Sequence, residues 1–254
     1  MKFFSLASGS TGNCFLIDNG KDLLLIDVGI PYNKIKEKLS ELNYDIDDVK
    51  YILITHSHND HIKSLNSFCM EKIYSCAKIP GIKNLMSKDQ DFYLGEYKVT
   101  PYPLSHDVPC FGYRIESDNK SLVYITDTGY VNYKIKKYLK NATYYIFESN
   151  HDINMLMDSA RPYFLKSRIL SDKGHLSNED ASEIIYESIG NNTKEIYLAH
   201  ISRDCNKKEL AYQTLIETFN SNKFDYSKLI IKALDKDDIL KGGELHEESV
   251  NCTM

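Results

Sequence analysis

The segment 55–61 (THSHNDH) constrains the fold of this chain more than any other stretch of its sequence. It places four metal-competent side chains within six residues, directly after the apolar run 51–54 (YILI). A short apolar run that ends in polar residues is typical of a buried strand opening into a loop. The imidazoles and the carboxylate can then converge on a cation. A solvated loop has no reason to space His at i, i+2 and i+5 around an Asp.

Three more candidate ligands follow apolar runs later in the chain, at His106, Asp127 and His200. Neutral imidazoles and carboxylates suit zinc, iron or manganese. No cysteine lies in the cluster, which argues against a closed structural zinc site and favours a site with open coordination positions. The seven candidate metal ligands are His56, His58, Asp60, His61, His106, Asp127 and His200.

The motif His56-x-His58-x-Asp60-His61 resembles the signature of the metallo-β-lactamase superfamily. Asp27, His106, Asp127 and His200 follow the order of that superfamily's other motifs. The resemblance implies an α/β fold, a four-layer αββα sandwich of two mixed sheets with helices on the outer faces. It also implies two divalent metal ions, for which zinc, manganese and iron are the candidates. His56, His58 and His106 would hold one ion, Asp60, His61 and His200 the second, and Asp127 would bridge them.

The resemblance gives Asp27 the role of orienting a ligand, because a metal-bound imidazole needs an acceptor for its other N–H. A carboxylate that caps a strand end is the alternative. Asp60 is a candidate acceptor for the proton of the nucleophile. The presence of His at position 58, where the superfamily's diiron oxidoreductases carry a carboxylate, favours a hydrolase over a redox enzyme.

Residues outside the ligand set point to the substrate. The segment 200–203 (HISR) resembles the endings of phosphodiesterase members of the superfamily, which makes Ser202 and Arg203 candidates for substrate binding. Glu148 and His175 resemble acidic and histidine motifs of the nuclease branches. An imidazole near the metals can protonate a leaving alkoxide, and a carboxylate can fix its tautomer. His151 is a weaker candidate for substrate binding, with a structural histidine as its alternative.

Spacing separates the nuclease branches. The 21 residues from His106 to Asp127 leave no room for the long arm of tRNA 3′-processing enzymes, and the 73 residues from Asp127 to His200 leave none for a β-CASP domain. The segments 6–14, 148–152 and 174–178 resemble the YycJ (WalJ) family of small metal-dependent phosphodiesterases with DNA exonuclease activity. Ser10 and Asn13, in a predicted tight turn at the mouth of the site, are candidate donors to the substrate.

The sequence therefore predicts a dinuclear metal-dependent phosphodiesterase that acts on DNA ends. A small-molecule hydrolase acting on a cyclic phosphodiester, lactone or thioester is the first alternative. A metal-stabilised regulatory module without turnover is the second. The net charge of −5 excludes little, because two divalent cations would offset most of it. Basic residues before His175, namely Lys166, Arg168 and Lys173, are candidates for phosphate contacts.

Length and composition favour one domain over residues 1–241, followed by a polar tail over 242–254. No apolar run is long enough to span a membrane, and the N-terminus does not read as a signal peptide. The six cysteines lack disulfide-framework spacing and are expected to be free thiols. We therefore expect a cytoplasmic enzyme. Its oligomeric state cannot be inferred from the sequence.

Hydrophobic periodicity predicts alternating strands and helices without repeats. Helices are expected near 35–42, 131–139, 154–165 and 208–219, with a further helix capped by Ser177. The expected strands cover residues 3–7, 14–18, 23–27, 51–55, 72–76, 97–102, 112–116, 121–126, 144–147, 195–200 and 228–231.

Overall fold

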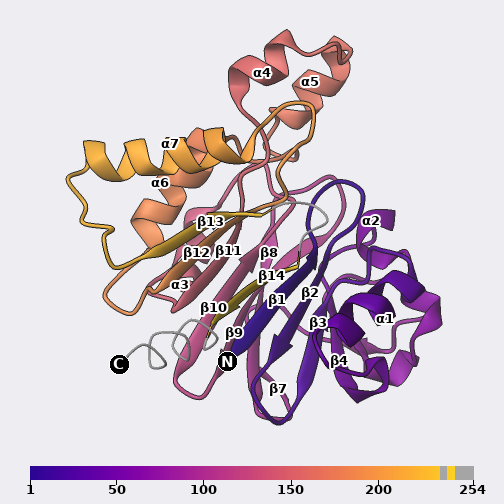
Figure 1. Cartoon of the computed structure of the whole chain (residues 1–254). Coiled ribbons are helices and arrows are strands. Elements are labelled where there is room, and N and C mark those ends of the chain that lie inside the picture. The colour runs from indigo at the N-terminus through magenta and orange to yellow at the C-terminus, as the bar shows by residue number, and fades with distance from the viewer. Residues whose placement is uncertain (235–238, 244–254) are drawn as a thin grey trace.

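The computed structural model describes residues 1–234 and 239–243. Two seven-stranded mixed sheets face each other, and helices cover their outer faces (Figure 1). The predicted αββα sandwich is therefore confirmed. Within the described ranges, no helix is long and apolar enough to cross a membrane.

The first sheet has the strand order β14-β1-β2-β3-β4-β5-β6. Strands β3 to β6 pair in parallel, whereas β14, β1, β2 and β3 pair antiparallel. The carboxyl ends of β3 and β4 consequently lie side by side, which brings the residues that follow them together. The bounds of these strands are β1 Lys2–Ala7, β2 Cys14–Asp18, β3 Leu23–Ile26, β4 Val49–Ile54, β5 Ile73–Ser75, β6 Asn84–Leu85 and β14 Leu240–Gly243.

The second sheet has the order β13-β12-β11-β10-β9-β8-β7. Here β10, β11, β12 and β13 are parallel, so four successive strand ends reach the same edge. The bounds are β7 Phe92–Leu94, β8 Tyr97–Leu104, β9 Cys110–Ser117, β10 Lys120–Ile125, β11 Tyr144–Glu148, β12 Glu195–Ala199 and β13 Ile230–Ala233.

Helices pack on both outer faces, except for a pair that projects from one end of the sandwich. In Figure 1 this pair, α4 and α5, stands clear of the sheets, while α6 and α7 lie along the second sheet and α1 along the first. The α-helices of the described residues are α1 Tyr32–Glu41, α2 Asn59–Ile62, α3 Lys136–Leu139, α4 Ile153–Asp158, α5 Tyr163–Ile169, α6 Asn178–Ser188 and α7 Lys208–Ser221.

The core between the sheets is rich in aromatic side chains. Phe3 packs edge-on against Tyr197, with ring centroids 5.0 Å apart, and Phe15 meets Tyr124 at 5.2 Å. All four side chains are buried. Rings of this size bury large apolar areas, and edge-to-face pairs add a directional preference. The two sheets are thereby held in a defined register, and so are the loops at their ends.

Several predicted elements differ from those observed. The prediction of a single helix over 154–165 is wrong. Residues 159–162 are not helical, and the chain forms α4 and α5 on either side of them. Pro162 is the N-cap of α5 and disfavours helical backbone at Arg161, so one continuous helix cannot run through this position. The helix expected over 131–139 shortens to α3, preceded by a 3-10 turn at Tyr133–Ile135. The capping role of Ser177 is confirmed, since its Oγ accepts from the backbone N–H of Asp180 at 3.0 Å.

The predicted tail begins inside a strand. Gly242 and Gly243 belong to β14, where they pair with Phe3 and Lys2 of β1. The remainder of the predicted tail, residues 244–254, lies outside the described residues. Of the cysteines, those at positions 14, 69, 76, 110 and 205 are free, as expected.

Candidate metal centre

The loop that follows β4 carries the four clustered ligand candidates, and backbone contacts hold it in place. The N–H of Asn13 donates to the carbonyl of Asp60 at 2.8 Å, and the N–H of Val28 donates to that of His61 at 2.9 Å. Gly29 passes so close that a Cβ placed there would lie 1.6 Å from the carbonyl oxygen of Asp60. Glycine is therefore required at position 29, because this contact leaves no space for a side chain.

Strand ends supply the other candidates. Asp27 follows β3, Asp127 lies two residues after β10, and His200 follows β12. All three have left-handed backbone, with φ of 58°, 60° and 55°. Non-glycine residues adopt this conformation at an energetic cost and cluster at functional sites. The conformation turns the chain sharply at the strand end, where the side chains come together.

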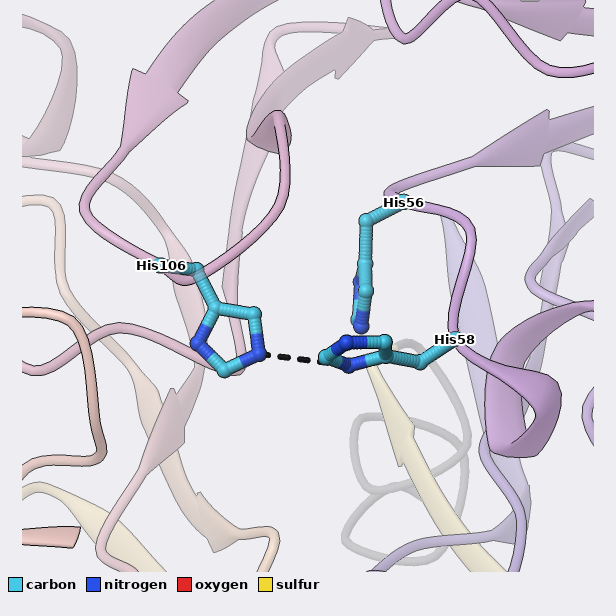
Figure 2. Close-up of side chains that lie close together, drawn as sticks. All are labelled: His56, His58 and His106. Carbon is cyan, nitrogen blue, oxygen red and sulfur yellow. Dashed lines mark hydrogen bonds between the residues drawn. The ribbon is translucent and has the colours of Figure 1, made fainter. Parts of the chain in front are cut away.

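The three histidines expected to hold one ion lie close together, although they come from different sheets. Figure 2 shows His56 and His58 on the loop after β4, facing His106 on the loop after β8. Nε2 of His106 lies 3.3 Å from Nδ1 of His58. One nitrogen atom from each of the three rings lies within 4.8 Å of the corresponding nitrogen atoms of the other two.

The second expected group lies beside the first. Ligand atoms of Asp60, His61 and His200 also lie within 4.8 Å of one another. Asp127 contacts this group, with its Oδ2 at 3.1 Å from Nε2 of His61 and its Oδ1 at 3.5 Å from Nε2 of His200. Asp127 also forms a close group with His61 and His56. It therefore lies between the two histidine groups, where a bridging ligand would have to be.

The hydrogen bonding of these atoms tests whether the site suits metal ions. Nε2 of His56, Nε2 of His200 and Oδ2 of Asp127 are buried and make no hydrogen bond. Buried polar atoms are rarely left without a partner, because each such atom loses its hydration. Three unpartnered atoms of the types that bind divalent cations lie in one cluster. The residues present therefore fit metal ions.

Asp27 holds the ring of His61. Oδ2 of Asp27 accepts from Nδ1 of His61 at 2.7 Å, and Oγ1 of Thr55 donates to the same oxygen at 2.9 Å. The backbone N–H of Thr55 donates to the other carboxylate oxygen at 2.9 Å. With Nδ1 engaged as a donor, Nε2 of His61 carries the lone pair, and Nδ2 of Asn13 lies 2.9 Å from it. Asp27 thus contacts both the end of the neighbouring strand, through Thr55, and the ring of His61.

Glu148, at the end of β11, plays a comparable part for two histidines. Its Oε1 accepts from Nδ1 of His175 at 2.8 Å and from Nδ1 of His200 at 2.9 Å, and its Oε2 accepts from the N–H of Thr128 at 2.9 Å. Burial raises the pKa of Glu148, but the two imidazoles outweigh burial and lower it to about 2. Burial likewise lowers the pKa of His200, yet Asp127 and Glu148 raise it to about 9.

A cavity of about 190 Å³ opens beside the cluster, and His106, His175 and His200 form part of its wall. Ser10, His151 and Ser202, all predicted to bind substrate, line it as well. His151 is 1% exposed, and neither of its ring nitrogens makes a hydrogen bond. Burial lowers the pKa of His151 to about 4, so its ring is neutral at pH 7 and can donate one N–H.

Not every candidate reaches the cavity. Asn13 is buried and places its Nδ2 2.9 Å from Nε2 of His61, and Arg203 is exposed and does not line the cavity. Of the basic residues proposed for phosphate contacts, Arg168 and Lys173 line the wall. Lys166 instead donates to the carbonyl oxygen of Met157.

The sequence analysis did not single out every residue of the site, and two charged ones are notable. Arg161 lines the cavity, and Asp107 places its Oδ1 3.2 Å from Nε2 of His58 and 3.3 Å from Nε2 of His106. The position of Asp107 directly after His106 was an available signal. Arg161 gave none, because it reaches the site only through the unforeseen break between α4 and α5.

Comparison with known proteins identifies relatives along most of the chain. Residues 7–130 match the family model described as the metallo-beta-lactamase superfamily. Exodeoxyribonuclease WalJ of Streptococcus pneumoniae is 38% identical over 234 residues, which cover 85% of this chain and 87% of the relative. Exodeoxyribonuclease YycJ of Bacillus anthracis is 37% identical over 241 residues, covering 88% and 91%.

Solved structures share the architecture at much lower identity. The metallo-beta-lactamase fold protein YhfI from Bacillus subtilis superposes with a TM-score of 0.70 at 16% identity. The superposition covers 95% of this chain and 99% of YhfI. At this identity the likeness supports the fold alone.

Proposed function

The chain belongs to the metallo-β-lactamase superfamily, and from this premise we propose that it is a dinuclear metal-dependent phosphodiesterase that degrades DNA from its ends. The curated relatives named exodeoxyribonucleases support the substrate class, and the ligand geometry supports the chemistry. The observation that carries the proposal is a hydrogen-bonded histidine and carboxylate, His175 and Glu148, which belong to neither of the two proposed ligand groups and have side-chain atoms within 4.8 Å of those of Asp127 and His200.

Each ligand has a defined part in this proposal. His56, His58 and His106 would hold one divalent ion, Asp60, His61 and His200 would hold the other, and Asp127 would be the ligand shared by both. The ions, when bound, supply a water of lowered pKa as nucleophile and stabilise the charge that develops on the phosphate. Asp60 takes the proton that the nucleophile loses. The imidazole and carboxylate donors suit zinc, manganese or iron.

His175 acts on the leaving group. Its Nδ1 is engaged by Glu148, so Nε2 is the nitrogen available to the substrate, and the side chain is 21% exposed at the cavity wall. Protonated at Nε2, the ring gives this proton to the leaving alkoxide as the P–O bond breaks. Glu148 holds the ring in this orientation, because its Oε1 accepts from Nδ1 at 2.8 Å.

The cavity beside the ligands suits the substrate's phosphates. Of the described residues that line it, none is Asp or Glu, whereas Arg161, Arg168 and Lys173 all contribute. Ser10, Ser202 and the neutral His151 add donors. We propose these as the phosphate-binding residues, and Asn13 as a residue that acts through His61. The cytoplasmic location, and Arg203 as a substrate contact, stay predictions.

Digestion of defined DNA substrates tests the proposal. Protein of measured metal content is given linear duplexes labelled at the 5′ or 3′ end, a covalently closed circle and an activated phosphodiester. We expect nucleotides to be released from ends, the circle to stay intact, and the activated phosphodiester to be hydrolysed. Asp127→Asn should reduce metal content and activity together, whereas His175→Ala should reduce activity alone. A metal-loaded protein inert on DNA but active on a lactone or thioester would refute the proposal. Inertness on every substrate would favour a regulatory module.

A further inference from the structure

The helical arm, defined here as residues 153–170 with α4 and α5, carries surface properties that the metal centre does not need. Figure 1 shows the arm projecting from one end of the sandwich. Its own small apolar cluster, formed by Leu156, Leu165 and Ile169 with Cys205, holds it together. Nζ of Lys166 in α5 also donates a hydrogen bond to the backbone carbonyl of Met157 in α4. The arm is thus a folded unit with one face toward the site and another toward solvent.

The inner face of the arm is part of the cavity wall. Leu165, Arg168 and Ile169 of α5, together with Arg161 of the link, line the same cavity as His175 and His200. The Arg168 guanidinium reaches the carboxylate of Asp107, which follows His106. A substrate held in this cavity would therefore be in contact with the arm.

The outer face is unusually apolar for a solvent-facing surface. Tyr163 is 78% exposed and Phe164 is 74% exposed, and they are neighbours in the first turn of α5. Ile153, Met157 and Leu170 are exposed nearby, so the arm holds five of the ten large hydrophobic side chains exposed in the described part of the chain. Such a concentration on so few residues marks an interaction surface.

Cationic side chains line the cavity, and aromatic rings are exposed on the arm beside it. Together they indicate which class of ligand would bind here. Arg161, Arg168 and Lys173 give the cavity wall a positive charge that suits phosphates, and no described wall residue is acidic. Arg161 and Arg168 also contact carboxylates outside the wall, Asp204 and Asp107. A small molecule held there would make no use of rings outside the cavity, whereas a polymer continues beyond it. Bases offer their faces to aromatic side chains where a strand is unpaired, and this stacking tolerates any sequence.

We propose that the helical arm binds an unpaired stretch of the DNA strand next to the cleaved end, with bases stacked on Tyr163 and Phe164 and phosphates on Arg161, Arg168 and Lys173. This inference rests on the proposed function, because it assumes that the strand at the metals is DNA. The inference predicts that the enzyme prefers DNA ends with an unpaired overhang to blunt ends. It also predicts that the arm contributes to DNA binding without taking part in hydrolysis.

The test compares the double variant Tyr163→Ala/Phe164→Ala with Tyr93→Ala. Tyr93 is matched in exposure at 73% but lies in β7, at the end of the molecule opposite the arm (Figure 1). Each protein, loaded with metal, is assayed on a single strand, an overhanging duplex, a blunt duplex and an activated phosphodiester. Metal content and circular dichroism verify the fold of each variant.

We expect KM for the single strand and the overhang to rise about tenfold or more per ring removed, with kcat and hydrolysis of the activated phosphodiester unchanged. A tenfold loss corresponds to about 1.4 kcal/mol, within the range for base stacking on an aromatic side chain. Lys173→Gln should also flatten the dependence of log Kd on log salt by about 0.7 for a single strand.

Equal KM values for the double variant, wild type and Tyr93→Ala on the overhang would overturn the inference while DNA hydrolysis by wild type upholds the proposed function. Loss of binding to anionic vesicles, with DNA kinetics intact, would overturn it in favour of a membrane surface. A wild-type protein that cleaves no DNA would overturn both proposals.

Discussion

Replacing Glu148 by Gln should separate charge from shape at the metal centre. One oxygen of Glu148 accepts from His175 and His200, and the other accepts from the N–H of Thr128 at 2.9 Å and of Leu176 at 3.5 Å. Glutamine has the same shape, but one oxygen becomes an NH₂ group. If the NH₂ group faces the backbone, it opposes the N–H groups of Thr128 and Leu176, and none of these donors has an acceptor there. If it faces the rings, His200 must carry its proton on Nε2 and cannot offer that atom to a cation.

The magnitudes follow from these two arrangements. A buried donor left without an acceptor costs about 1–3 kcal/mol, so the free energy of unfolding should fall by that amount. Loss of a partner that orients a ligand typically lowers metal affinity or activity about 10- to 100-fold. We expect both effects in Glu148→Gln, measured by chemical denaturation and by metal titration of stripped protein.

Glu195→Gln is the matched control. Glu195 is also buried, accepting from the Tyr197 hydroxyl at 2.6 Å and from the N–H of Gly243 at 3.0 Å, but it begins β12 while His200 follows the end of that strand. The control should lose stability and keep wild-type metal affinity. If Glu148→Gln retained both wild-type metal affinity and wild-type turnover, the argument that this carboxylate fixes the tautomers of His175 and His200 would fail.

Three further predictions follow from the same geometry. His175→Ala should keep its metal and lower turnover on DNA ends by about 10²- to 10⁴-fold, as expected for loss of a general acid; a turnover within a few-fold of wild type would exclude that role. Metal affinity should rise as pH increases from about 6.5 to 9, because Asp127 and Glu148 raise the pKa of His200 to about 9 and its proton must leave before Nε2 can bind a cation. Calorimetry in buffers of different ionisation enthalpy should detect the released protons, and pH-independent binding would contradict the argument. Gly29→Ala should lower the free energy of unfolding by about 1–3 kcal/mol or more, since its Cβ would lie 1.6 Å from the Asp60 carbonyl oxygen; thermal melts of the stripped protein measure this, and an unchanged melting temperature would contradict the close approach.

The sequence predicted the sandwich and most of its strands because their signals are local. Many of the buried strands carry apolar runs, and several ligand candidates follow such a run closely, as His56 follows β4 and His200 follows β12. What the sequence did not reveal depends on contacts between distant segments. Strand β14 lacks an apolar signature and forms because β1 offers it an edge. Arg161 entered the cavity only because Pro162 splits a helix that periodicity had joined.

The ligand candidates come from both halves of the sandwich, with His56, His58, Asp60 and His61 after a strand of the first sheet and His106, Asp127 and His200 after strands of the second. Bound cations would link the two halves of the sandwich. The free energy of unfolding should therefore increase with the concentration of free metal, according to mass action. During synthesis the first four ligand candidates leave the ribosome long before His200. The first sheet is complete only when β14 has been made and pairs with β1. Metal loading should therefore report on the finished chain, and chelation should loosen the sandwich at this end first.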